Sequence, residues 1–218
     1  DENSAGAVVG TLSTTDIDSG DSHTYALSGT DKDSFEIVEG QLKLKDTVTA
    51  NYEMKSGYSV TVKATDSGGS IFGKTLTVSV TDINEVPTDI ALSSVTISED
   101  SAAGTVVGDL SAADPDVGDA ASFSIIGGTG SNMFSVNANN QLVVKSGATL
   151  DYETLSQPTV TIRTTDSGGL SFDKTLTLSV TDVYESSNQA PAISGTPSSQ
   201  IAEDSVYSFT PTGSDPNG

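Results

Sequence analysis

The fold class is decided by residues 58–80, YSVTVKATDSGGSIFGKTLTVSV. On both sides of the central Asp66–Gly69 segment, apolar and polar residues alternate, as in Tyr58–Ala64 and Thr75–Val80. A period of two places one set of side chains in a core and the other in solvent, which is typical of half-buried antiparallel strands. The Asp-Ser-Gly-Gly segment is typical of a turn, because glycine accepts positive φ. The stretch therefore predicts two strands joined by a turn.

The same pattern returns about one hundred residues later, which makes the chain a repeat protein. The segment Ala7–Gly10 recurs as Thr105–Gly108, and Asp66–Gly69 recurs as Asp166–Gly169. A third copy is indicated because Pro191 precedes a Glu-Asp-Ser triplet at the same spacing as Pro87 does. We therefore predict repeat 1 at residues 1–86 with its first strand missing, repeat 2 at residues 87–186, and an incomplete third repeat at residues 187–218.

Further strands are expected where short apolar and β-branched runs lie between turns. In repeat 1 these runs are Val8–Leu12, Thr24–Leu27, Phe35–Val38 and Gln41–Leu44. About seven short strands in about one hundred residues indicate an immunoglobulin-like sandwich. The predicted fold is all-β, with tandem antiparallel β-sandwiches arranged end to end. The aromatic residues in strand patterns are assigned to the core: Tyr25, Phe35, Phe72, Phe123, Phe134 and Phe172.

The composition excludes several classes of function. The 218 residues include 30 acidic and nine basic side chains, a net charge of −21, which opposes nucleic-acid binding. The chain has no Cys and one His, so a zinc site is not expected. No apolar run approaches the roughly 18 residues of a membrane helix, so no membrane insertion is expected in this segment. No catalytic motif is found, and we expect no enzyme. Because Asp1 is not a natural start, we expect an excised piece of a longer protein.

The acidic residues concentrate at the ends of the expected strands. In a sandwich, strand ends lie at the two poles, so one pole of each repeat meets the opposite pole of the next. Carboxylates gathered there repel one another unless a hard cation such as Ca²⁺ binds them. The positions are Glu2, Asp16, Asp18, Glu53, Asp66, Asp82 and Glu85 in repeat 1 and Glu99, Asp114, Asp116, Asp151, Glu153, Asp166, Asp182 and Glu185 in repeat 2.

These positions form five motifs in the same order in both repeats, and through them the chain resembles the cadherin repeat, specifically its bacterial cadherin-like relatives. The resemblance covers repeats 1 and 2 and weakens in the third. The motifs are an early Glu (Glu2, Glu99), Asp-x-Asp (Asp114, Asp116), Asp-x-Glu (Asp151, Glu153), the Asp before Ser-Gly-Gly (Asp66, Asp166), and the linker Asp82–Glu85.

The resemblance implies calcium ions between successive repeats, about two to three of them at the first junction. The implied ligands there are Glu2, Asn51, Glu53, Asp82 and Glu85 from repeat 1, Asp114, Asp116 and Asp166 from repeat 2, and the carbonyls of Ile83 and Asn84. The second junction would use Glu99, Asp151, Glu153, Asp182 and Glu185, while Asp16, Asp18 and Asp66 would face a preceding repeat. Because Asn51 replaces an Asp, the outermost ion of the first junction is expected to be the weakest.

The function implied by the resemblance is that of calcium-rigidified adhesion or extender repeats of a secreted or surface-attached bacterial adhesin. Three interpretations remain open at this point: a spacer, direct contact with other copies or cell surfaces, and a polysaccharide-binding module. The last is disfavoured because the chain has no Trp for stacking on sugar rings. The incomplete first and third repeats also make strand exchange between molecules conceivable.

Overall fold

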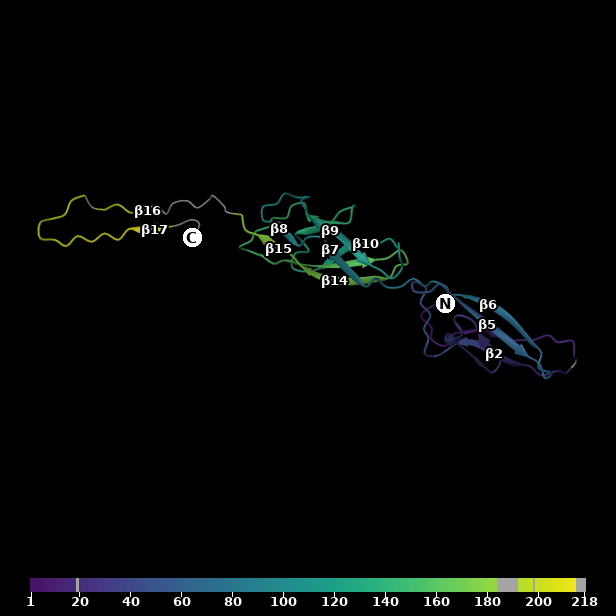
Figure 1. The fold of residues 1–218 in the computed structure, drawn as a ribbon. Coiled ribbons are helices and arrows are strands. Elements are labelled where there is room, and N and C mark those ends of the chain that lie inside the picture. The colour runs from purple at the N-terminus through teal and green to yellow at the C-terminus, as the bar shows by residue number, and fades with distance from the viewer. Residues whose placement is uncertain (19, 184–191, 198, 215–218) are drawn as a thin grey trace.

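The structure, a computed structural model, describes residues 1–18, 20–183, 192–197 and 199–214. Repeat 1, repeat 2 and a C-terminal hairpin follow one another along an elongated molecule (Figure 1). Nearly all regular structure in the described residues is β, with one short 3₁₀ turn, η1 (Lys32–Ser34). The predicted all-β class with successive antiparallel sandwiches is confirmed.

Repeat 1 is a sandwich of two three-stranded sheets in the part of it that the structure describes. One sheet has the order β1 (Val8–Thr11), β4 (Gln41–Leu44), β3 (Phe35–Val38), and the other β2 (Thr24–Ser28), β5 (Gly57–Thr65), β6 (Ile71–Ser79). The predicted hairpin is formed by β5 and β6, with Val60 opposite Leu76. Alternate residues of β5, among them Val60 and Val62, are buried, as the period of two predicts.

Repeat 2 repeats this plan and adds strands to it. One sheet has the order β11 (Phe134–Val136), β12 (Gln141–Val144), β9 (Val106–Ala113), β7 (Asp89–Leu92), and the other β10 (Ser122–Gly127), β13 (Thr159–Thr165), β14 (Ser171–Thr177). In addition, β8 (Thr96–Ser98) pairs in parallel with β15 (Ser179–Thr181). Both β7 and β8 precede Glu99 in repeat 2, whereas the printed sequence begins one residue before the corresponding Glu2.

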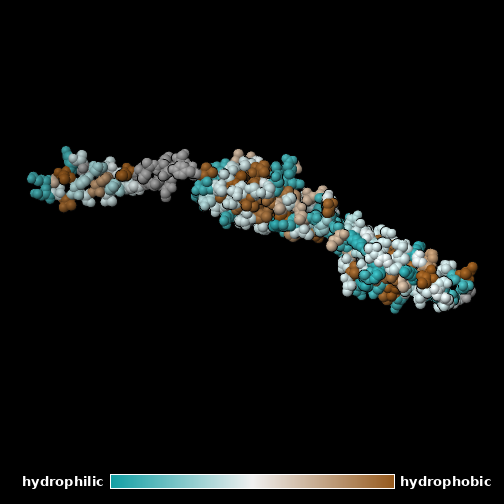
Figure 2. Space-filling model, in the orientation of Figure 1, coloured by the Kyte–Doolittle hydropathy of each residue, from teal (hydrophilic) through white to brown (hydrophobic). Residues whose placement is uncertain are grey.

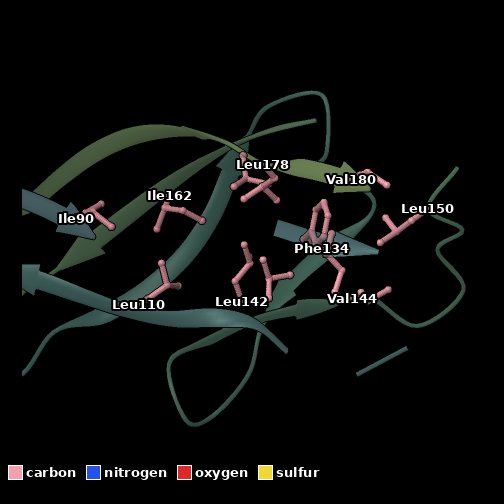
Figure 3. Packing of buried hydrophobic residues seen from close by; sticks show 12 residues of the cluster. Ile90, Leu110, Phe134, Leu142, Val144, Leu150, Ile162, Leu178 and Val180 are labelled. Carbon is pink, nitrogen blue, oxygen red and sulfur yellow. The ribbon is translucent and has the colours of Figure 1, made fainter. Parts of the chain in front are cut away.

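The cores lie between the sheets. In repeat 2, Ile162 and Leu178 on one side face Leu110 and Leu142 on the other (Figure 3). Ile90 of β7 joins this core and is fully buried. The core of repeat 1 is smaller and consists of Phe35, Leu42, Leu44, Ala50, Tyr58, Val60, Val62 and Val80.

Among the described residues, β1 lies at the edge of its sheet, whereas β9 in repeat 2 pairs with both β12 and β7. Val9 is 40% exposed, whereas its counterpart Val107 is 5% exposed. The prediction that Phe72 is a core residue is wrong, because its side chain is 68% exposed. Its counterpart Phe172 packs against the core of repeat 2. The other predicted core aromatics are buried or pack against a core.

In the C-terminal part, β16 (Ala192–Ser194) pairs with β17 (Thr212–Ser214) in an antiparallel ladder. Ile193 and Ile201 are 78% and 60% exposed, so these side chains are not in a core. The third repeat therefore stays a prediction. No helix in the described ranges has the length and apolar character needed to cross a membrane.

Candidate metal centre

The early glutamates are the buried centre of each C-terminal pole. Glu2 is 1% exposed, and its carboxylate accepts hydrogen bonds from the backbone N–H of Tyr52 (2.7 Å) and of Ile83 (2.8 Å). Glu99 accepts the corresponding bonds from Tyr152 (2.9 Å) and Val183 (2.6 Å). The two N–H groups hold the pKa of Glu2 below its ordinary value, because they stabilise the charged form. Each glutamate therefore connects its own segment to the turn that carries Glu53 or Glu153 and to the residues that follow the last strand of its repeat.

The linker connects this pole to repeat 2. The N–H of Glu85 donates to Oδ2 of Asp116 (2.7 Å), and the amide of Asn84 donates to Oδ2 of Asp166 (3.0 Å). Within repeat 2, the N–H of Asp116 donates to Oδ1 of Asp114 (3.0 Å). The Asp-x-Asp pair and Asp166 of repeat 2 therefore lie against the linker of repeat 1.

Carboxylates form three groups at this junction, two of which share Glu53, and one of which joins the two repeats. In each group, one oxygen per residue lies within 4.8 Å of the others. Ligand oxygens on opposite sides of a calcium ion are about 4.6–5.2 Å apart, because each Ca–O distance is about 2.3–2.6 Å. The spacing therefore suits calcium. The groups are Glu2 with Glu53 and Glu85, Glu53 with Asp82 and Asp116, and Asp114 with Asp119 and Asp166.

Burial, together with mutual repulsion, raises the pKa of several of these carboxyls. Desolvation raises the pKa of Asp82, and the charges of Asp116 and Glu2 raise it further. The N–H of Glu53 lowers the pKa of its own side chain, but burial together with the charges of Glu2 and Glu85 outweighs this effect and the pKa is raised. Desolvation also raises the pKa of Asp114, against a hydrogen bond from Asp116 that lowers it. A bound cation would offset the repulsion among these carboxylates when they are ionised.

Two carboxylate oxygens supply a more specific test of the fit to a cation. Oε2 of Glu53 and Oε2 of Glu85 are buried and have no hydrogen-bond partner among the described residues. Leaving a buried charged oxygen unsatisfied is costly. Both atoms belong to residues of the groups above and line a negatively charged junction. A hard cation would satisfy both oxygens, so the residues present fit calcium.

The other two poles carry partial versions of the same arrangement. At the far pole of repeat 2, Glu99, Glu153 and Asp182 form one group, and Glu185 lies outside the described residues. At the outer pole of repeat 1, Asp16, Asp21 and Asp66 form another group. There Asp16 also accepts hydrogen bonds from the N–H of Asp18 and from Nε2 of His23, both at 3.0 Å.

Two acidic ligands implied by the sequence, Asp151 and Asp18, lie outside these groups. Oδ1 of Asn51 accepts a hydrogen bond from the N–H of Met54 (2.7 Å). Asp151 similarly accepts bonds from the N–H and the hydroxyl of Thr154 (2.9 and 2.8 Å). Both side chains therefore stabilise the turn that carries Glu53 or Glu153. The ligand roles of the Ile83 and Asn84 carbonyls stay predictions.

The sequence reasoning missed Asp21 and Asp119, which join the groups of Asp16 and Asp114. Asp119 also accepts hydrogen bonds from the side chain and the N–H of Ser167, next to Asp166. A signal was present, because both repeats have a Gly-Asp pair at the same distance after Asp-x-Asp. The turn at this glycine returns the chain to the pole.

Comparison with known proteins agrees with this geometry. Residues 93–181 match the family model of the cadherin domain. Repeat 2 is therefore similar to a cadherin domain. Human "Cadherin-related family member 2" is 32% identical over 197 residues, covering 83% of this chain and 15% of that protein. Rat "Cadherin-8" is 32% identical over 160 residues, covering 65% of this chain and 20% of that protein. The chain thus spans a fifth or less of these two cadherin relatives.

Solved cadherin structures share the fold. The EC1-2 segment of human protocadherin-24 aligns with a TM-score of 0.67 at 24% identity, over 83% of this chain and 91% of that one. Domains 3–6 of protocadherin gamma B2 align with a TM-score of 0.69 at 25% identity, over 99% of this chain and 52% of that one. Two successive repeats of this chain therefore match the arrangement of successive extracellular cadherin domains.

Proposed function

We propose that repeats 1 and 2 are calcium-binding repeats of an extracellular adhesion protein, in which ions at the junction hold the two sandwiches in a fixed relation. The observation that carries this proposal is the pair of buried, unsatisfied oxygens of Glu53 and Glu85. They lie in carboxylate groups whose spacing suits calcium and which include residues of both repeats.

The groups suggest the distribution of ligands. Glu53 belongs to two of them, so it would bridge two neighbouring ions, one with Glu2 and Glu85 and one with Asp82 and Asp116. A third ion would lie on the repeat 2 side, held by Asp114, Asp119 and Asp166. This arrangement agrees with the expectation of about two to three ions at the junction.

Calcium would act mechanically at this site. Without it, the ionised carboxylates of the two repeats repel one another and oppose a fixed junction. With it, the ions crosslink the linker to the Asp-x-Asp pole, and binding to this ordered state stabilises it. Extracellular modules bind calcium at about 10⁻⁴ to 10⁻³ M, so the sites would be filled outside the cell.

The names of the relatives support a role in cell adhesion. They are named cadherins and protocadherins, and one similar structure, of protocadherin gammaB7, is titled a cis-dimer. We therefore propose other copies of the same protein as the partners. The reported relatives are animal proteins, and nothing in the comparisons supports the predicted bacterial source or the polysaccharide ligand.

The test is calorimetric titration with Ca²⁺, combined with melting curves in calcium and in chelator. About two to three ions and a higher melting temperature in calcium are expected. Glu53→Gln and Glu85→Gln should each lower the number or affinity of bound ions. Glu39→Gln, at an exposed loop position away from the junction, is the matched control. Absence of both heat and a melting shift would sink the proposal.

A further inference from the structure

The longest stretch of the chain without a charged residue is residues 120–144, in repeat 2. It runs from the residue after Asp119 to the residue before Lys145. The corresponding part of repeat 1, residues 22–44, is charged in both signs. Its charged residues are Asp31, Lys32, Asp33, Glu36, Glu39 and Lys43. The two repeats therefore differ in charge over the same part of the fold.

The uncharged stretch forms one side of the repeat 2 sandwich, which we call the β10–β11 side. Among the described residues, β10 and β11 are each an end strand of their sheet, and the two strands contact each other. Phe123 and Ile125 of β10, Met133 before β11 and Val136 of β11 are partly buried and pack against the core. Hydrophobic residues are visible at the surface of repeat 2, the middle part of the molecule (Figure 2).

Ile126 is an additional residue in β10. The register between β10 and β13 shifts between Ile125 and Gly127, whereas β2 and β5 of repeat 1 pair without interruption. Ile126 therefore forms a β-bulge that repeat 1 does not have. It is the one large apolar side chain of residues 120–144 that is exposed, at 47%. Because a bulge hinders the addition of a further strand to a sheet edge, a partner would contact this side through side chains.

Repeat 1 carries an ion pair where repeat 2 has uncharged residues. Glu36 of β3 lies opposite Lys43 of β4 and pairs with it at 3.2 Å. The corresponding residues of repeat 2 are Ser135 and Val143. Charged side chains at sheet edges protect proteins from association. The edge strand β3 of repeat 1 has this protection, and the β10–β11 side of repeat 2 does not.

We propose that the β10–β11 side of repeat 2 is a contact surface between two copies of this chain, related by a two-fold axis near Ile126. This inference rests on the proposed function, which takes other copies as the partners. A two-fold contact uses the same patch on both copies, so on a chain of net charge −21 most patches would set like charges against each other. The β10–β11 side avoids this repulsion.

The neighbouring charges do not change this conclusion. On β13, Arg163 lies opposite Ser124 of β10, and its guanidinium donates two hydrogen bonds to Asp173. This ion pair adds no net charge next to the β10–β11 side. A strongly charged partner would gain no electrostatic attraction there, whereas a second uncharged side fits it. Because both partners offer the same patch, the assembly closes at the dimer.

Analytical ultracentrifugation of the full chain over a wide concentration range tests this proposal. A monomer–dimer equilibrium is expected in calcium and in chelator alike, because residues 120–144 contribute no carboxylate to the junction. Ile126→Asp should weaken association by about tenfold or more, since it sets two like charges in an apolar contact. Val95→Asp is the matched control and should associate like the unaltered chain. Val95 is 42% exposed and follows β7, at the opposite end of the sheet from β11.

A mixture of two variants tests the two-fold arrangement. Ile126→Asp and Ile126→Lys should each be mainly monomeric, whereas an equal mixture of the two should form heterodimers, because the axis then places opposite charges next to each other. Both should melt near the temperature of the unaltered chain, since position 126 is exposed. Asn132→Asp, which introduces the charge that repeat 1 has at Asp33, should weaken association to a smaller extent.

Four results would overturn the proposal. These are a chain that stays monomeric at all concentrations, association that survives the Ile126→Asp change, growth beyond the dimer, and a mixture of the two Ile126 variants that stays monomeric. Calcium binding without association would contradict this inference and leave the calcium proposal intact. Association through Ile126 without calcium binding would do the reverse.

Discussion

Repeats 1 and 2 share their motifs and most of their strands, and differ in one edge. Repeat 2 has β7 and β8, a core of twelve buried residues and a covered Phe172, whereas repeat 1 has a core of eight and an exposed Phe72. Their acidic poles are nevertheless alike, since Glu2 and Glu99 accept the same pair of backbone hydrogen bonds. The comparison teaches that the acidic pole of each repeat is built from the same local turns around its buried glutamate.

The largest expected effect is obtained by making repeat 2 resemble repeat 1. Ile90→Ala removes the buried anchor of β7 and should lower the free energy of unfolding of repeat 2 by about 2–5 kcal/mol. Hydrogen exchange should rise along β9, because its partner strand then detaches more often. Chemical denaturation with exchange detected by mass spectrometry measures both.

Ala91→Ser on the exposed face of the same strand is the control and should change little. Unchanged stability in the Ile90→Ala variant would mean that β7 does not account for the difference between the repeats.

The second effect separates charge repulsion from calcium binding at the junction. The pKa of Asp82 is raised, so its ionised form destabilises the calcium-free fold above that pKa, and protonation relieves this as the pH falls. Asp82→Asn should therefore raise the melting temperature in chelator at pH 7 and reduce the gain on adding calcium. If Asp82→Asn shifted the melting temperature equally in chelator and in calcium, this explanation would be contradicted.

A smaller effect concerns Glu2 and acid stability. Its pKa is lowered from the ordinary 4.5 by the N–H groups of Tyr52 and Ile83. The stability that it contributes is therefore present above pH 4.5 and is lost as the pH falls through the lower folded-state value. Glu2→Gln should flatten the acid part of the stability curve of repeat 1 in chelator. Urea midpoints between pH 3 and 7 measure this, and Glu39→Gln should retain the original slope.

The smallest effect tests a surface difference. Arg163 and Asp173 form a two-bond ion pair on β13 and β14, at 2.7 and 2.8 Å, where repeat 1 has Lys63 and Gly73. Arg163→Ala should lower the stability of repeat 2 only slightly, because exposed ion pairs are weak. The loss of stability in this variant should be smaller still in 1 M salt, which screens the ion pair. A salt-independent loss would instead indicate lost packing of the arginine stem.

The strands could be predicted because their alternation is a local property. Phe35–Val38 and Gln41–Leu44 were predicted with the bounds that the structure has. Phe72 could not be placed correctly by its own sequence, since Phe72 and Phe172 share the same alternation, yet one is exposed and the other packs against a core. The order of the acidic motifs predicted where the carboxylates gather. The positions of Asn51 and Asp119 depend on turn geometry, which sequence patterns do not show. The side-chain oxygen of Asn51 accepts a local hydrogen bond, whereas the side chain of Asp119 joins the carboxylate group of Asp114 and Asp166.

The parallel pairing of β8 with β15 has a consequence for a chain under tension. Both strands run toward the same pole, so a pull on the two ends of repeat 2 displaces them in opposite directions along their length. The hydrogen bonds between Thr96–Ser98 and Ser179–Thr181 are then loaded together in shear, and they must break almost at once. When this rod is stretched, repeat 2 should therefore yield only at a force high enough to break these hydrogen bonds together.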